Sequence, residues 1–186
     1  MRRVLYVALA ALGLAPSAYA SSSIDLKLND NMAEVTYATA ADGLGFQDGD
    51  VGVGLLFNDD SDIAAHASLQ SFGRMDDYVS FAVGLKGYAI RVDEPSENVA
   101  SFAIGGGVGY TIPNTPVTAS LSGFIAPNIL TFGDASRVRE WSARVQAQLL
   151  PNAAVFVGWR ELSLRLDEGG TYKLDDEFHV GLRLGF

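Results

Sequence analysis

The sequence has no cysteine and, beyond residue 20, no long apolar run. Without cysteine, neither disulfide bonds nor thiolate metal sites can form. No segment after residue 20 reaches the roughly 18 uninterrupted apolar residues of a membrane-spanning helix. Basic residues are also scarce, because 13 lysines and arginines face 22 acidic residues in the 186-residue chain, a net charge of −9. This balance argues against nucleic acid as a partner.

Glycine and apolar residues, by contrast, are abundant. The chain has 20 glycines and is 48% hydrophobic. Because glycine inside a helix costs about 1 kcal/mol relative to alanine, this mixture disfavours helices. Strands packed side by side tolerate it, so the composition favours an all-β protein of one domain.

The N-terminus has the form of an export signal. Arg2 and Arg3 precede an uncharged apolar run, residues 4–15, and the residues 18–20 read Ala-Tyr-Ala, a signal-peptidase pattern. The run is too short to span a bilayer as a helix. We therefore predict a cleaved signal peptide over residues 1–20, with cleavage between Ala20 and Ser21, and one domain over residues 21–186.

The rest of the chain alternates between apolar and small or polar residues, as strands do. The last stretch is the clearest, because Phe178, Val180, Leu182, Leu184 and Phe186 share one face. Ten stretches alternate in this way: 24–28, 33–37, 51–57, 63–69, 79–85, 102–110, 117–126, 141–149, 155–159 and 178–186. We predict a single-domain antiparallel transmembrane β-barrel of about ten strands, with eight as the fallback, since such barrels have even strand numbers.

The alternation breaks phase in two places. Near Arg160 and Glu161 the apolar residues change face, and a similar slip occurs at Tyr88 and Ile90. The pattern is compatible either with a β-bulge or with the strand leaving the membrane.

Connections between the stretches also alternate in length. Residues 112–116 and 150–152 form tight, proline-marked turns, whereas residues 93–98, 127–136 and 167–171 are longer and mostly polar. Short periplasmic turns and longer external loops are typical of outer-membrane barrels, and an even strand count places both termini in the periplasm. A soluble periplasmic ligand-binding barrel is the alternative. The polar faces favour the membrane barrel, because they carry mainly Ser, Gly, Ala and Gln, which suit a crowded lumen.

Charged and polar side chains on the inward faces predict the lumen lining. Paired, they would close the barrel with salt bridges, and hydrated, they would line a narrow pore. The predicted lumen-lining residues are Lys27, Glu34, His66, Lys86, Arg144, Gln146, His179 and Arg183. Aromatic residues near strand ends predict girdles at the membrane interfaces, with Tyr78, Tyr110, Trp141 and Trp159 as members.

Catalytic and metal-binding signals are weak. His66 and Ser68 share a strand face, and a histidine can activate a serine hydroxyl when a carboxylate orients it, as in lipid A deacylases. Glu34, Glu140 and Glu161 are open candidates for that carboxylate. A polar lumen lining explains the pair more simply. The acidic turn at residues 58–62 lacks the spacing of a calcium-binding EF-hand loop and suits a solvated hairpin tip. The sequence therefore predicts no cofactor and no metal.

Several short motifs resemble the YfaZ family of Gram-negative outer-membrane proteins. They are the acidic turn Asn58–Asp62, Gly107–Tyr110 before a proline turn, Phe124–Leu130, Gly158–Arg160, and the ending Val180–Phe186. The resemblance implies a small outer-membrane barrel, and it supplies no catalytic residues. The terminal Phe186 also resembles the signal that the barrel-assembly machinery reads.

These observations predict a small outer-membrane β-barrel with a structural or narrow passive-channel role and no enzymatic activity. The expected partners are outer-membrane lipid, lipopolysaccharide and the barrel-assembly machinery, with the protein a monomer and no nucleic acid bound. The alternatives are a lipid A-modifying hydrolase that uses His66 and Ser68, and the soluble periplasmic barrel.

Overall fold

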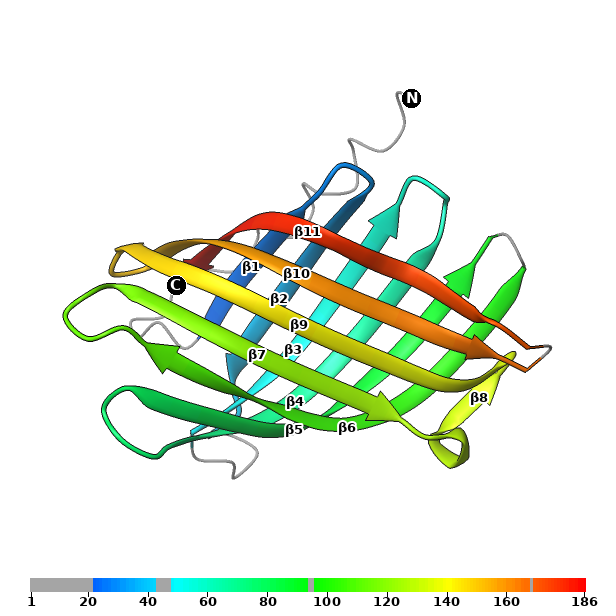
Figure 1. Cartoon of the computed structure of the whole chain (residues 1–186), viewed down its shortest axis with the longest axis horizontal. Coiled ribbons are helices and arrows are strands. Elements are labelled where there is room, and N and C mark those ends of the chain that lie inside the picture. The colour runs from blue at the N-terminus through cyan, green and yellow to red at the C-terminus, as the bar shows by residue number, and fades with distance from the viewer. Residues whose placement is uncertain (1–21, 43–47, 94–95, 168) are drawn as a thin grey trace.

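The computed structural model describes residues 22–42, 48–93, 96–167 and 169–186 (Figure 1). The predicted signal peptide and its cleavage site lie outside the described residues. The strands are β1 (Ser22–Leu28), β2 (Met32–Ala40), β3 (Gly49–Asn58), β4 (Ile63–Arg74), β5 (Val79–Val92), β6 (Glu97–Thr111), β7 (Val117–Ala126), β8 (Thr131–Gly133), β9 (Ala135–Leu150), β10 (Ala153–Leu166) and β11 (Thr171–Gly185). A 3₁₀ helix, Asn128–Leu130, precedes β8. Among the described residues, no helix is long and apolar enough to cross a membrane.

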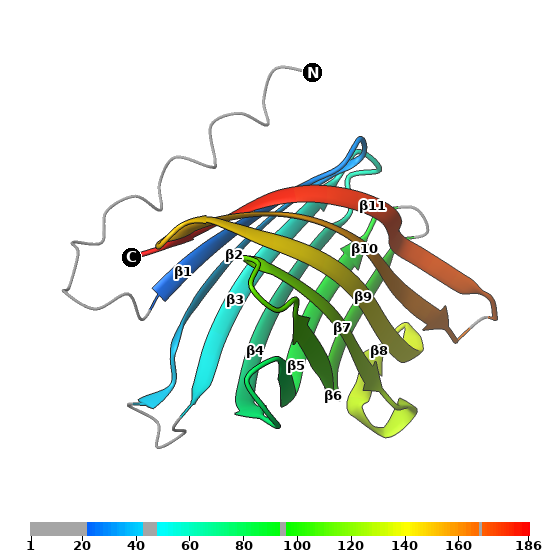
Figure 2. The same cartoon turned by 60° about the vertical axis from the view of Figure 1, so that its left-hand side comes forward.

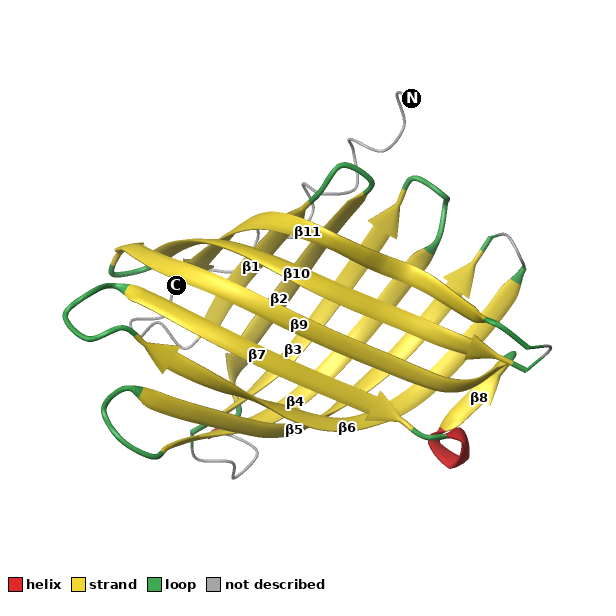
Figure 3. Ribbon diagram, in the orientation of Figure 1, coloured by secondary structure: helices red, strands yellow, loops and turns green. Residues whose placement is uncertain are grey.

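Ten of these strands form a closed antiparallel barrel, as Figure 2 shows, which confirms the predicted fold class. Each long strand pairs with the next along the chain, and β11 pairs with β1 to complete the ring. The ring closes where the first described residue meets the last, since the Phe186 N–H donates to the Ser22 carbonyl at 2.9 Å. The short β8 extends the wall by pairing with the start of β6. Strand accounts for nearly all regular structure (Figure 3).

The outer face of the wall is apolar. Val83, Ile104, Val157 and Val180 alternate with inward residues, and each is 56–60% exposed. Side chains of this kind gain free energy when they leave water, and a belt of them around a closed barrel is the surface that lipid covers. The structure thus places the predicted apolar strand faces on the outside of the barrel.

The inside of the barrel differs between its two ends. We call the end that holds Ser22 and Gly185 the terminal end, and the end that holds the β10–β11 connection the far end. Toward the far end the interior is filled by the apolar cluster, which consists of Met32, Leu56, Ala64, Tyr88, Ile90, Val92, Val99, Ala103, Phe124, Ala126, Ala135, Val138, Leu162, Leu164 and Leu174. The middle and the terminal end hold the charged residues.

The two expected breaks in strand phase have a different cause. Along β10 the inward positions continue without interruption from Phe156 through Arg160 to Leu162 and Leu164, all buried. Tyr88 and Ile90 likewise continue the inward face of β5, whose registers with β4 and β6 are regular. The inward face becomes apolar there because it enters the apolar cluster. The alternation of inward and outward side chains continues along both strands, and what changes is the part of the interior that the inward side chains contact.

A true irregularity of strand pairing lies on β11. In the β10–β11 pairing, Leu162 lies opposite Asp175 and Ser163 lies opposite Lys173, which leaves Leu174 as an extra residue. This β-bulge allows both Leu174 and Asp175 to be buried, although they are adjacent in sequence.

We expect Leu164→Ala to destabilise the barrel by about 2–5 kcal/mol, because Leu164 is fully buried in the apolar cluster and its truncation leaves a cavity. Urea unfolding of protein refolded into lipid vesicles, followed by tryptophan fluorescence, measures this loss. Leu149→Ala is the matched control, since Leu149 is 63% exposed on the outer face. Equal losses in both variants would contradict a packed far end.

Candidate functional site

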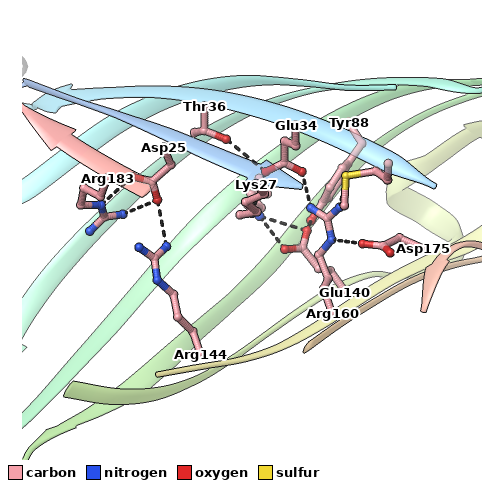
Figure 4. Close-up of polar contacts among 12 residues, drawn as sticks. Asp25, Lys27, Glu34, Thr36, Tyr88, Glu140, Arg144, Arg160, Asp175 and Arg183 are labelled. Carbon is pink, nitrogen blue, oxygen red and sulfur yellow. Dashed lines mark hydrogen bonds and ion pairs between the residues drawn. The ribbon is translucent and has the colours of Figure 1, made fainter. Parts of the chain in front are cut away.

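The candidate site is the charged interior, which is built from ion pairs that join different strands (Figure 4). Five basic side chains, Lys27, Lys86, Arg144, Arg160 and Arg183, contact four carboxylates, those of Asp25, Glu34, Glu140 and Asp175. Because charged groups removed from water need compensating partners, these pairs determine what the interior can do.

The first group of ion pairs lies in the middle of the barrel and has Arg160 at its centre. We call this group the middle layer. Its guanidinium is 3% exposed and binds two carboxylates, with Nη1 donating to Glu34 Oε2 and Nε donating to Asp175 Oδ2 at 2.6 Å. The Lys27 ammonium donates to the other Glu34 oxygen at 2.6 Å, and the Thr36 hydroxyl donates there at 3.1 Å. Arg160 therefore links β2, β10 and β11 on the inside of the wall.

A second group crosses the lumen. Lys86 on β5 donates to both carboxylate oxygens of Glu140 on β9, at 2.8 and 2.9 Å, and the Tyr88 hydroxyl donates to Glu140 Oε2 at 2.5 Å. Two strands, β6 and β7, separate β5 from β9 along the wall. The contact thus spans the interior between two strands that are not neighbours in the wall, next to the apolar cluster.

A third group lies nearer the terminal end. Asp25 accepts from Arg183 Nε at 2.6 Å and from Arg144 Nη1 at 2.8 Å. Arg144 Nη2 also donates to Gln146 Oε1 at 2.6 Å, and its guanidinium lies 3.4 Å from the centre of the Phe156 ring. The side chain of Arg183 is 44% exposed, so this group marks the place where the interior begins to meet solvent.

The predicted lumen-lining residues all occupy inward-facing positions on the strands of the barrel. Most of them join the ion-pair groups just described. The two histidines do not: His66 has its ring 6.5 Å from that of Tyr88, and His179, which is 3% exposed, packs edge-on against Phe156. His179 Nδ1 is buried without a hydrogen-bond partner among the described residues.

Sequence reasoning missed Arg160, Asp175 and Tyr88 as interior polar groups, and it considered Glu140 only as a catalytic candidate. Glu140 and Arg160 could have been found, because each lies two residues along its strand from an inward position. Glu140 lies two residues before Ser142, and Arg160 lies two residues after Gly158. Asp175 could have been found as well, because it lies four residues along β11 from the inward His179, in the part of the strand where the alternation is unbroken.

The His66–Ser68 pair faces the interior from β4, but no hydrogen bond joins the two side chains within the described residues. The carboxylates considered as a third member are engaged elsewhere. Glu34 binds Lys27 and Arg160, whereas Glu140 binds Lys86 and Tyr88. Glu161 lies on the outer side of β10 with Lys173. The arrangement is that of a polar wall rather than of an assembled nucleophile and base.

The acidic turn between β3 and β4 is more ordered than a solvated tip. Asp62 is 1% exposed, and its carboxylate accepts from the Tyr172 hydroxyl at 2.7 Å and from the Asp93 N–H at 2.9 Å. The Asn58 side chain also bonds to it at 2.9 Å. Within the described residues, no group of three or more His, Cys, Asp or Glu side chains could hold a metal ion. Asp62 therefore joins the β3–β4 turn to Asp93, which follows β5, and to Tyr172 at the start of β11.

The predicted girdle residues lie on the outer face. Tyr78, Tyr110 and Trp141 are 42–47% exposed. Trp159 is half-buried, and its indole N–H donates to Asp176 Oδ1 at 3.2 Å. An aromatic ring with one polar contact suits the boundary between lipid and water.

A closed antiparallel barrel with an apolar outer belt, aromatic residues at its margins and an ion-paired interior defines an outer-membrane type of β-barrel. The chain belongs to the YfaZ family, because the model of that family, described as YfaZ precursor, matches residues 1–186. The match confirms the family resemblance seen in the sequence motifs.

Solved outer-membrane porins share the fold. The chain is similar to the KdgM porin, with 8% identity and a TM-score of 0.50 over 89% of this chain and 98% of that one. A KdgM porin in complex with disordered oligogalacturonate gives 10% identity and a TM-score of 0.51 over 89% and 99%. The outer-membrane channel DcaP of Acinetobacter baumannii gives 12% identity and a TM-score of 0.44 over 87% of this chain, which spans about half (54%) of DcaP. No curated protein matches the sequence.

We expect Arg160→Met to destabilise the barrel by about 3–5 kcal/mol, because it leaves Asp175 buried with an uncompensated charge and leaves Glu34 with Lys27 as its one remaining cation in the described residues. The urea midpoint of protein refolded into vesicles measures the effect. Arg183→Met, which removes a cation whose side chain is 44% exposed, is the control and should cost clearly less. Adding Asp175→Asn to Arg160→Met should restore part of the loss, and a loss that is unchanged by this second substitution would contradict the charge explanation.

Proposed function

We propose that the mature protein spans the outer membrane as a closed, non-catalytic barrel with a structural role. The observation that carries this proposal is the pairing of the interior charges across the lumen, above all the contact of Lys86 on β5 with Glu140 on β9. A narrow passive channel would need these groups to be hydrated, and here they bind one another.

The apolar cluster supports the closed state independently. Leu56, Val138 and Leu164 are each 0–1% exposed, and they come from β3, β9 and β10 around the ring. An ion would have to leave its water to pass them, which is costly because these apolar side chains cannot replace the hydration shell. The far end therefore opposes conduction by exclusion of water, and the middle layer opposes it by ion pairing.

The family and the porin-like fold support the outer membrane as the location. On this proposal residues 1–20 direct export and are removed, the terminal end faces the periplasm and the far end faces outward. Phe186 then ends the last strand as the assembly signal. Its ring lies 6.3 Å from that of Tyr37, on the outer face beside the closing pair of β1 and β11. The barrel works as a monomer embedded in lipid and lipopolysaccharide.

We expect the protein to insert into planar bilayers without steady current steps, because both interior layers exclude a continuous column of water. Single-channel recording of the purified barrel tests this, with a KdgM-type porin inserted under the same conditions as the positive control. Regular, salt-dependent steps would contradict the closed barrel and favour the narrow channel.

The hydrolase alternative has its own test. We expect cells that produce Ser68→Ala to show the same lipid A profile by mass spectrometry as cells that produce the unchanged protein, because the serine has no hydrogen bond to His66. Cells without the protein provide the reference profile. A lipid A species that depends on the protein and disappears with Ser68→Ala would instead assign the alternative.

A further inference from the structure

Three arginines gather on the outer wall near the far end. Arg137 and Arg139 alternate with buried residues of β9 on the same side as Trp141, and Arg165 lies on the neighbouring β10 directly opposite Arg137. Arg139 and Arg165 are exposed, and Arg137 is half-buried. We call these residues the arginine patch. Figure 1 shows β9 and β10 side by side, so the patch covers one continuous piece of wall.

The arginine patch forms no ion pair with the described part of the protein. Within the described part of the chain, none of the three guanidinium groups forms an ion pair with a carboxylate. The nearby Lys173 is different, because it binds Asp176 at 2.5 Å and Glu161 at 3.8 Å.

Such an arrangement is unfavourable by itself. Like charges placed directly opposite each other on paired strands repel, as Arg137 and Arg165 do here. Glu161 lies on the same face of β10, but its ion pair is with Lys173, and none of the acidic side chains in the described residues forms an ion pair with these arginines. The structure thus presents three unpaired cations where an anion from outside would relieve their repulsion.

The height of the patch on the wall indicates where that anion lies. Trp141 is two positions from Arg139 along β9, a distance of about 7 Å, and from Trp141 toward the terminal end the outer face is apolar. Tryptophan marks the level of the lipid headgroups. The arginines therefore lie just outside the hydrocarbon, at the level of the charged headgroups.

Apolar side chains flank the patch. Phe132 on β8 is 54% exposed and Ile129 in the preceding 3₁₀ helix is 83% exposed, and β8 contacts β9. A free inorganic anion gains no binding free energy from contact with such apolar surfaces. A ligand with a charged head and hydrocarbon chains can contact the arginines and the apolar side chains together.

We propose that Arg137, Arg139 and Arg165 bind the phosphate groups of lipopolysaccharide in the outer leaflet. Guanidinium groups match phosphate oxygens with paired, charge-assisted hydrogen bonds, and they are weakly hydrated at an interface. The inference rests on the proposed function, because it requires the far end to face the outer leaflet. It adds a specific ligand and a specific face to a barrel whose interior is closed.

The test compares two double variants that remove the same number of exposed arginines. Arg139→Gln with Arg165→Gln removes the two exposed members of the patch, and Arg74→Gln with Arg91→Gln removes two exposed arginines of β4 and β5, away from it. The probe is purified lipopolysaccharide, intact or stripped of phosphate, added to protein purified in detergent from outer membranes. Trp141, one of the two tryptophans of the chain, lies two positions from Arg139 along β9, so a change in intrinsic fluorescence reports binding at the patch.

We expect the patch variant to weaken binding of intact lipopolysaccharide by at least about tenfold, and removal of phosphate to weaken binding to the unchanged protein similarly. The control variant should bind within about twofold of the unchanged protein, since it keeps the patch. No binding by the unchanged protein, or equal losses in the two variants, would overturn the inference. Displacement by inorganic phosphate at the same phosphate concentration would also overturn it, because the ligand would then be free phosphate.

Membrane fractionation separates this inference from the proposed function. If the protein is recovered in the outer membrane but fails to bind lipopolysaccharide, the arginine patch is misassigned and the barrel proposal stands. If the protein is recovered in the periplasmic fluid, the proposed location fails first and the inference fails with it.

Discussion

The structure depends on one constraint: every strand must find its main-chain hydrogen-bond partners inside the ring, because hydrocarbon offers none. The pairing of β1 with β11 meets this constraint, since it joins the two ends of the sheet from Ser23 opposite Gly185 to Leu28 opposite Val180. Once the ring is closed, the period of two assigns each side chain to lipid or to the interior. Charged residues then have only the inside available along the apolar belt, and there they have to bind one another.

The interior is narrow enough that side-chain size must be matched across neighbouring strands. Gly54 lies opposite His66, Gly158 opposite His179, and Gly181 opposite Phe156. In each case a β-carbon on the glycine would meet the ring of its partner. Glycine here makes room for a large inward ring, which explains why a chain rich in glycine can also be tightly filled. A barrel built in this way has little space left for a hydrated path.

Most of the wall could be predicted from the sequence, because alternation is a local property of each strand. The ten stretches and the closed barrel were predictable for that reason, as were inward positions such as Lys86 and Arg144. The partners of those residues were not, since Lys86 meets Glu140 only through the register of the whole ring. The apparent phase breaks at Ile90 and Leu162 show a further limit. An apolar residue signals burial, but it does not show whether lipid or a packed interior covers it.

Similarity of fold does not settle what passes through a barrel. The KdgM porin and this chain have similar barrel folds at 8% sequence identity, and at that level of sequence divergence the inward-facing residues are free to differ. In this chain most of the inward charged residues bind each other, whereas the arginine patch on the outer wall forms no ion pair within the described residues. Unsatisfied charge is where a protein has interaction free energy left for another molecule, and satisfied charge is where it has little. By that criterion we infer that this barrel meets its ligand on its outer surface and not in its lumen.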